Sequence, residues 1–319
     1  MSKKDILKYL IFAAVGALIV YFILKNFDFE AFKTTIQTAK IHFVIISVLG
    51  GVLAVLLRAL RWQLLLKPMG YETKLSNAYH STMSGYLVNL GIPRAGEVSR
   101  CALMAKTDKI PVNVLVGTVV SERILDLIML ALVITSAVVL EFDLLYNYID
   151  QNVLSKLADK KGPIIIGLTV LIAGAIFLFR SKKLFSGGGK IASIIQGFAD
   201  GLKSVFTVQK PIQFILYTVG IWFCYWMMTY FVLQAFDFTA HLGVTGGLCT
   251  LVFTSLGVII PAPAGIATIK SVEIGLFQIF SLPLIQANAV GIVLFFSNIL
   301  MIIIAGTISF LAMAYRTKV

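Results

Sequence analysis

Long, continuous stretches of apolar residues dominate the pattern of this chain. They do not alternate with polar residues, which favours helices over the strands of a membrane barrel. A helix needs roughly 20 apolar residues to span a bilayer. Six runs approach this length and each predicts one spanning helix: 9–24, 41–57, 124–140, 163–179, 211–236 and 284–313. Two further apolar stretches, 78–93 and 245–280, are interrupted by glycine and proline.

Composition strengthens this interpretation. Apolar residues make up 59% of the 319 residues and charged residues only 13%, whereas soluble domains have about 45–50% and about 25%. The first run follows Lys3, Lys4 and Lys8 but lacks a clear small-residue cleavage site, so we expect a retained anchor helix and not a signal peptide. The sequence thus predicts an all-α, polytopic transmembrane bundle.

The net charge of +12 would also suit a nucleic-acid-binding protein, but its distribution favours a membrane topology. Lysine and arginine gather between alternate runs, as the positive-inside rule requires. With both termini cytoplasmic, the six runs each cross once and both interrupted stretches return to their own side. We therefore expect two oppositely oriented re-entrant broken helices in a multi-pass protein of the cell (inner or plasma) membrane, with no nucleic-acid partner.

The chain is expected to form one membrane domain, residues 1–319, with inverted-repeat halves of about 1–140 and 141–319. Apolar residues at helical spacing after Gly187, up to Phe206, predict an interfacial amphipathic helix. An amphipathic linker packed on the bundle is the alternative. The three cysteines and three histidines are dispersed, so we expect no disulfide, metal site or cofactor.

The first candidate site follows the break in the first interrupted stretch. Gly91 and Pro93 interrupt the helix, Gly96 follows, and three charged residues then recur at three-residue spacing on one helix face. With Asn89, they predict a head-group site at a helix start, suited to phosphate. The alternative is that the arginines are ordinary cytoplasmic loop residues paired with the glutamate. The charged residues are Arg94, Glu97 and Arg100.

The second candidate site is the acidic and basic group Glu122, Arg123 and Asp126. If their helix starts near Pro111, these charges lie within the bilayer, where charges normally face the protein interior, pair and mark a pathway. Glu122 and Asp126 share a helix face, and Arg123 is spaced to pair with Asp126. If the helix starts only at Arg123, they are interfacial anchors.

The third candidate lies in the late interrupted stretch. Pro261, Pro263 and Gly265 break it, and Lys270 and Glu273 follow on the next predicted helix. Paired interrupted segments in two halves of opposed topology indicate a transporter-type site. By contrast, the segment from Arg58 through Arg61 to Trp62 is interpreted as serving interface anchoring and packing.

Taken together, these motifs resemble the flippase-like transmembrane domain of lysylphosphatidylglycerol synthases. The resemblance rests on the Asn-x-x-x-Pro-Arg-x-Gly-Glu-x-x-Arg run from Asn89 to Arg100, on the Glu122-Arg123 pair with Asp126, and on the late Pro/Gly break. It implies movement of an aminoacylated phospholipid between leaflets, while a separate soluble domain, not recognised in this sequence, charges the lipid.

The late motif departs from the family pattern, which has Pro-Gly-Gly-x-Gly followed shortly by a glutamate. Here the chain reads Pro263-Ala-Gly-Ile-Ala267, and Lys270 occupies the glutamate position. Glu273, three residues on, shares that helix face and could substitute. The departure bears on which substrate is handled.

We therefore expect a lipid flippase or transporter that catalyses no reaction. In this hypothesis Arg94, Arg100 and Arg123 contact a phosphate and Glu97, Glu122 and Asp126 are their counter-ions. Two alternatives remain: an intramembrane enzyme with Glu122 or Asp126 as a base, and an accessory subunit of a lipid or glycolipid synthase. The expected partner is a membrane phospholipid or lipid-linked substrate; a homodimer or a membrane synthase partner stays open.

Overall fold

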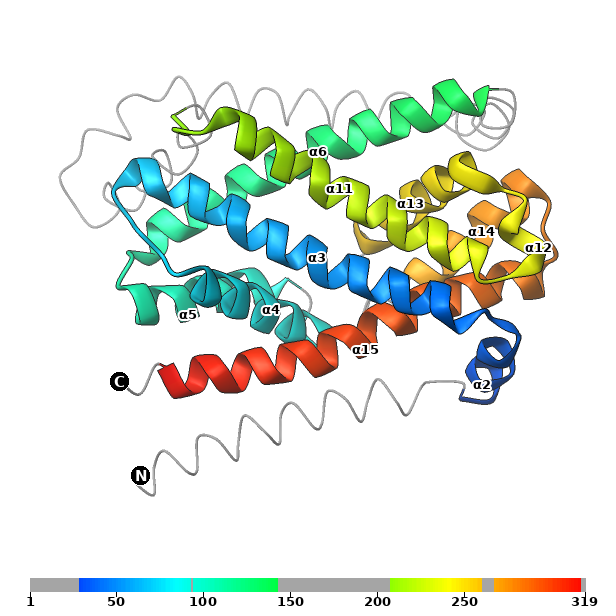
Figure 1. Cartoon of the computed structure of the whole chain (residues 1–319), viewed down its shortest axis with the longest axis horizontal. Helices are drawn as coiled ribbons and strands as arrows, with labels where there is room; N and C mark the ends of the chain where they lie inside the picture. The colour runs from blue at the N-terminus through cyan, green and yellow to red at the C-terminus, as the bar shows by residue number, and fades with distance from the viewer. Residues whose placement is uncertain (1–28, 93, 143–206, 260–266, 317–319) are drawn as a thin grey trace, which may run out of the picture.

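The computed structural model describes residues 29–92, 94–142, 207–259 and 267–316, and every regular element in these ranges is helical. Four long helices, joined by shorter ones, form the bundle (Figure 1). The long helices are α3 (Ile41–Leu66), α6 (Val112–Leu140), α11 (Pro211–Gln234) and α15 (Leu284–Arg316). The shorter helices are α2 (Phe29–Thr38), η1 (Lys67–Met69), α4 (Leu75–Gly91), α5 (Ala95–Asp108), α12 (Asp237–Ala240), α13 (Gly243–Ile259) and α14 (Ala267–Phe280).

All four long helices are long and apolar enough to cross a membrane. They contain four of the six predicted runs; the runs 9–24 and 163–179, and the predicted interfacial helix, lie outside the described residues. Their outward faces are apolar: on α11, for example, Ile212, Ile215, Leu216, Val219 and Phe223 are all exposed. A continuous exposed apolar face of this kind suits contact with lipid and not with water. The all-α membrane bundle predicted from the sequence is confirmed.

The pair α3 and α11 forms the central seam of the bundle. Gly50 lies against Met228 and the carbonyl of Cys224, so the two helices approach closely, as small residues allow in membranes. Ser47 donates a hydrogen bond to the carbonyl of Met228 at 3.0 Å. At one end the backbone N–H of Lys40, just before α3, donates to the carbonyl of Ala235, just after α11, at 2.8 Å. The two helices are therefore antiparallel.

The first interrupted stretch folds as α4, with α5 following its break, and the second folds as α13 and α14. The two helices of each pair, α4 with α5 and α13 with α14, pack against each other. The first pair follows the end of α3 and the second follows the end of α11, so the antiparallel seam sends them to opposite ends of the bundle (Figure 1). This is the arrangement expected for two opposed re-entrant elements, and their re-entry into the bilayer stays a prediction.

The packing of the two pairs is similar. Pair α4/α5 adjoins α6 and α4 also packs on α15, while pair α13/α14 adjoins α15 and α13 also packs on α6. Each hairpin thus contacts a long helix from both halves of the chain. In each half of the described chain a long helix is followed by one helix of three or four residues, by two longer short helices and by a second long helix, which is compatible with the predicted inverted halves.

Glycine permits the close contact inside the first hairpin. A Cβ atom on Gly96 would collide with the carbonyl oxygen of Gly85 and with the side chain of Asn89, while one on Gly85 would lie 2.7 Å from the carbonyl oxygen of Gly96. The backbone N–H of Gly96 donates to Asn89 Oδ1 at 2.7 Å, which satisfies one of the free donors at the start of α5. Arg94 precedes α5 with a left-handed φ of 68°.

We expect Gly96→Ala to lower the free energy of unfolding by about 1–3 kcal/mol, because overpacking forces backbone shifts. Gly50→Ala is the matched control: its Cβ would lie 3.4 Å from the flexible side chain of Met228, an ordinary contact. The thermal midpoint of the detergent-solubilised protein measures both. Equal midpoints for the two variants would show that the hairpin contact is not tight.

Candidate functional site

The described residues contain a charged cluster between α3, α5 and α6. Its centre is Asp126 on α6, which pairs with Arg58 at 2.6 Å and with Arg61 at 3.0 Å, both from α3. Arg123, one turn before Asp126 on α6, lies 3.4 Å from the same carboxylate. Three guanidinium groups therefore share one acid.

Glu122 forms the second buried ion pair of the cluster, with Arg100 of α5. The Glu122 side chain is 0% exposed, and the Arg100 guanidinium lies over the ring of Trp62, 4.7 Å from its centroid. The Trp62 indole N–H in turn donates to Thr118 Oγ1 at 2.9 Å. Cation–π stacking and the ion pair together hold hairpin helix α5 against α3 and α6.

The cluster reaches the surface through Glu97 and Arg123. Arg123 Nε lies 2.8 Å from Glu97 Oε1, and the two side chains are 42% and 37% exposed. The ion pairs thus form a series of alternating charge, which leads from Glu97 and Arg123 at the surface to Asp126 inside the bundle. Helix α6 has 29 residues, so it is about 43 Å long and Asp126, about 21 Å from its start, lies near its midpoint.

The structure brings most of the sequence-predicted residues together. Glu97, Arg100, Glu122, Arg123 and Asp126 form the cluster. Asn89 caps α5, and Gly91 is the last residue of α4. Arg94 is exposed at the start of α5. Pro93, Pro261, Pro263 and Gly265 lie outside the described residues.

Helix α6 begins at Val112, so the alternative in which it starts only at Arg123 is wrong. The alternative for the first candidate site, in which both arginines are loop residues paired with Glu97, is also wrong for Arg100. Its partner is the buried Glu122, and it lies inside α5.

Arg58 and Arg61 were interpreted from the sequence as serving interface anchoring and packing, and the anchoring part is wrong. Helix α3 continues through them to Leu66, and their side chains are 5% and 0% exposed. Arg58 Nε also donates to the hydroxyl of Tyr225 on α11 at 2.8 Å, a contact the sequence did not indicate. The signal in the sequence for a continued helix was that apolar residues lie on both sides of the two arginines and that no glycine or proline occurs between Arg58 and Pro68.

Lys270 and Glu273 form a second, separate polar site. Glu273 is buried, with a side chain that is 6% exposed, and pairs at 2.8 Å with Lys270, whose side chain is 67% exposed. Asn288 of α15, which the sequence analysis did not single out, donates to the same carboxylate. This site connects α14 to α15, in the hairpin opposite the main cluster.

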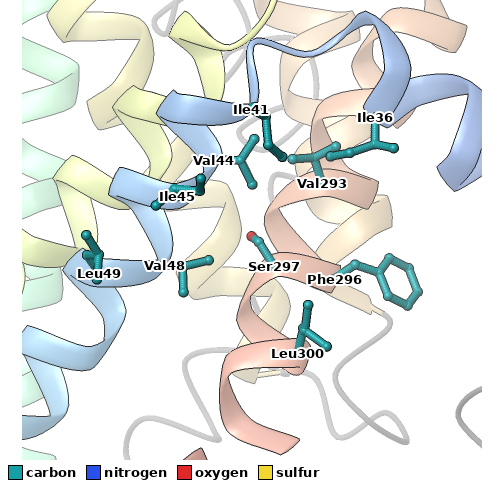
Figure 2. A pocket seen from close by; sticks show the side chains of 10 residues that line it. All are labelled: Ile36, Ile41, Val44, Ile45, Val48, Leu49, Val293, Phe296, Ser297 and Leu300. Carbon is teal, nitrogen blue, oxygen red and sulfur yellow. The ribbon is translucent and has the colours of Figure 1, made fainter. Parts of the chain in front are cut away.

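A groove between α3 and α15 has a volume of about 320 Å³ (Figure 2). Its lining is apolar except for Ser297 and includes no charged side chain, so it is unsuited to a head group. No group of three or more histidine, cysteine or acidic side chains in the described ranges could hold a metal. The charged cluster presents guanidinium groups, whose geometry matches carboxylate and phosphate oxygens.

Apolar spanning helices, two hairpins and a buried charge cluster define this chain as a multi-pass α-helical membrane protein. The family model described as "Lysylphosphatidylglycerol synthase TM region" matches residues 6–306, so the chain belongs to that family and the resemblance seen in the sequence is confirmed.

Two curated relatives come from Methanocaldococcus jannaschii. UPF0104 membrane protein MJ1595 is 28% identical over 129 residues, which cover 40% of this chain and 37% of that protein. UPF0104 membrane protein MJ1078 is 27% identical over 227 residues, which cover 70% of this chain and 92% of that protein. The match thus spans well under half the length of the first relative and nearly all of the second. No solved structure matches the chain.

We expect Asp126→Asn to lower the free energy of unfolding by about 3–5 kcal/mol, because it leaves buried guanidinium groups without their counter-ion. Glu97→Gln, which breaks the exposed pair with Arg123, should cost less than about 1 kcal/mol. Thermal unfolding in detergent compares the two. If both variants unfold at the same temperature, Asp126 does not hold the cluster together.

Proposed function

We propose that this protein moves phospholipids between the leaflets of the membrane, as a flippase or transporter. The observation that supports this most is the series of alternating charges that leads from the exposed Glu97–Arg123 pair to Asp126, near the midpoint of α6. Charges at that depth are costly and typically belong to a substrate pathway. Membership of a family named for a lipid synthase's membrane region agrees with a lipid-related role.

In this proposal the head group first meets Arg94 and Arg123. Both are accessible, Arg94 at the start of α5 and Arg123 in its exposed pair. The phosphate takes the place of the Glu97 carboxylate on Arg123, so one ion pair is exchanged for another. Arg100 lies deeper, behind Glu122, and is reached only after the outer pair has opened.

The proposal includes no covalent chemistry, since lipid movement breaks and forms no bond in the substrate. It places the protein in the cell membrane with both termini in the cytoplasm. On that topology the α4/α5 hairpin and the exposed pair face the cytoplasmic leaflet, because α4 follows the cytoplasmic end of α3.

Replacing Arg123 or Arg94 by alanine should slow lipid movement at least about tenfold, the loss expected for one charge-assisted hydrogen bond. The measurement uses proteoliposomes with acyl-labelled fluorescent phosphatidylglycerol, in which dithionite quenches only the outer leaflet. Lys106→Ala is the matched control. Lys106 is exposed on α5, the helix that begins after Arg94, and its replacement removes one positive charge without touching the cluster.

Thermal midpoints of all three variants verify that they are folded. Wild-type rates in Arg123→Ala and Arg94→Ala would contradict the transport proposal. In that case, co-purification of a lipid synthase from mild detergent would favour the accessory-subunit alternative.

A further inference from the structure

Arg61 is a buried cation with incomplete hydrogen bonding. Its side chain is 0% exposed, and Nη2 donates to Asp126, but Nε and Nη1 have no hydrogen-bond partner. Arg58, one turn earlier on the same helix, differs. Its Nε donates to Tyr225 and its Nη2 to Asp126. Of the two arginines on α3, Arg61 is therefore the one with buried donors to spare.

Glu122 has an unpaired hydrogen-bond acceptor, where Arg61 has unpaired donors. One carboxylate oxygen accepts from Arg100, while Oε1 is buried without a partner. Glu122 and Asp126 are four residues apart on α6, so they share a helix face with about 5–6 Å between their Cβ atoms. Because Arg61 is bonded to Asp126, its free donors and the free acceptor of Glu122 belong to the same cluster.

Unsatisfied buried groups of this kind cost about 1–3 kcal/mol each, and more when charged. A ligand that relieves both must accept a hydrogen bond from Arg61 and donate one to Glu122. The inner part of the cluster, in which no side chain is more than 12% exposed, contains three arginines, Arg58, Arg61 and Arg100, but only two carboxylates. This surplus of positive charge favours an anionic acceptor over water.

We propose that Arg61 and Glu122 form an inner head-group site, which binds a phosphate that has an O–H or N–H donor beside it. The phosphate oxygen accepts from Arg61, and the neighbouring hydroxyl or ammonium group donates to Glu122. Head groups of the glycerol or ethanolamine type meet this requirement. A choline head group does not, because its quaternary nitrogen has no hydrogen to donate. The inference rests on the proposed transport function and adds a basis for substrate selection.

Selection of this kind is strong because a site with unpaired buried polar groups rejects the analogue that lacks the matching donor. The outer arginines, Arg94 and Arg123, recognise any phosphate. The inner site would then distinguish among the lipids that the outer site admits.

The test compares Arg61→Lys with Arg58→Lys in proteoliposomes with acyl-labelled phosphatidylglycerol or phosphatidylcholine. Both variants keep a positive charge near Asp126, and Arg58→Lys also removes the hydrogen bond to Tyr225, so it is the more severe control for effects on the fold. Only Arg61→Lys removes unpaired guanidinium atoms, Nε and Nη1, and replaces their fixed planar geometry by one ammonium group at the end of a flexible chain. We expect the wild type to move phosphatidylglycerol faster than phosphatidylcholine, Arg61→Lys to reduce that ratio about tenfold, and Arg58→Lys to retain it.

A binding measurement separates this inference from the transport proposal. The thermal midpoint of the detergent-solubilised protein is followed with dihexanoyl phosphatidylglycerol, dihexanoyl phosphatidylcholine or inorganic phosphate, since a ligand of the folded state raises the midpoint. Phosphatidylglycerol should stabilise the wild type and Arg58→Lys more than the other two ligands do, and should lose this advantage in Arg61→Lys.

The outcomes are distinct. If no variant moves any lipid but phosphatidylglycerol still stabilises all except Arg61→Lys, the transport function fails and the inner site stands. Equal lipid preference in Arg61→Lys and Arg58→Lys overturns the inner site. Stabilisation by inorganic phosphate as strong as that by phosphatidylglycerol contradicts its assignment to a lipid head group.

Discussion

The pairing of Asp126 with three guanidinium groups is the interaction on which the described bundle depends most. A lone carboxylate near the middle of a membrane-spanning helix would be costly, and Arg58 and Arg61 supply the compensation from α3. The Arg100–Glu122 pair, one turn away on α6, fastens α5 to the same surface. The α4/α5 hairpin is therefore held to the long helices by charge as well as by apolar packing.

Stability alone is a weak reason for such a cluster. Buried ion pairs often contribute no more than well-packed apolar residues of similar volume. Here the arrangement also leaves Arg61 and Glu122 with unpaired buried atoms, which a purely structural cluster would avoid. These unpaired groups are the basis of the proposal that a ligand completes the cluster.

The sequence predicted the elements governed by local rules. Continuous apolar runs were sufficient for the long helices, and glycine and proline marked both hairpin breaks. The pairing of Arg123 with Asp126 followed from their three-residue spacing on a helix.

Contacts across the fold were not predicted from the sequence. Arg58 and Arg61 are separated from Asp126 by 68 and 65 positions, and the apolar residues around them indicate at most a buried position, not the residue with which they pair. The same holds for Tyr225 beside Arg58 and for Asn288 beside Glu273. These four residues acquire their roles only through packing of α3 on α6 and α11 and of α14 on α15.

The two polar sites differ in a way that bears on the proposed transport. In the first, arginines are in excess and one exposed pair leads inward to buried ones. In the second, a buried carboxylate has an exposed lysine as its cation. In the low dielectric of the bilayer, a charge without a counter-ion is far more costly than a charge that exchanges one counter-ion for another. A head group that replaces one member of an ion pair at each site would cross the membrane as a succession of such exchanges, and the hairpins at the two ends of the bundle each supply one of them.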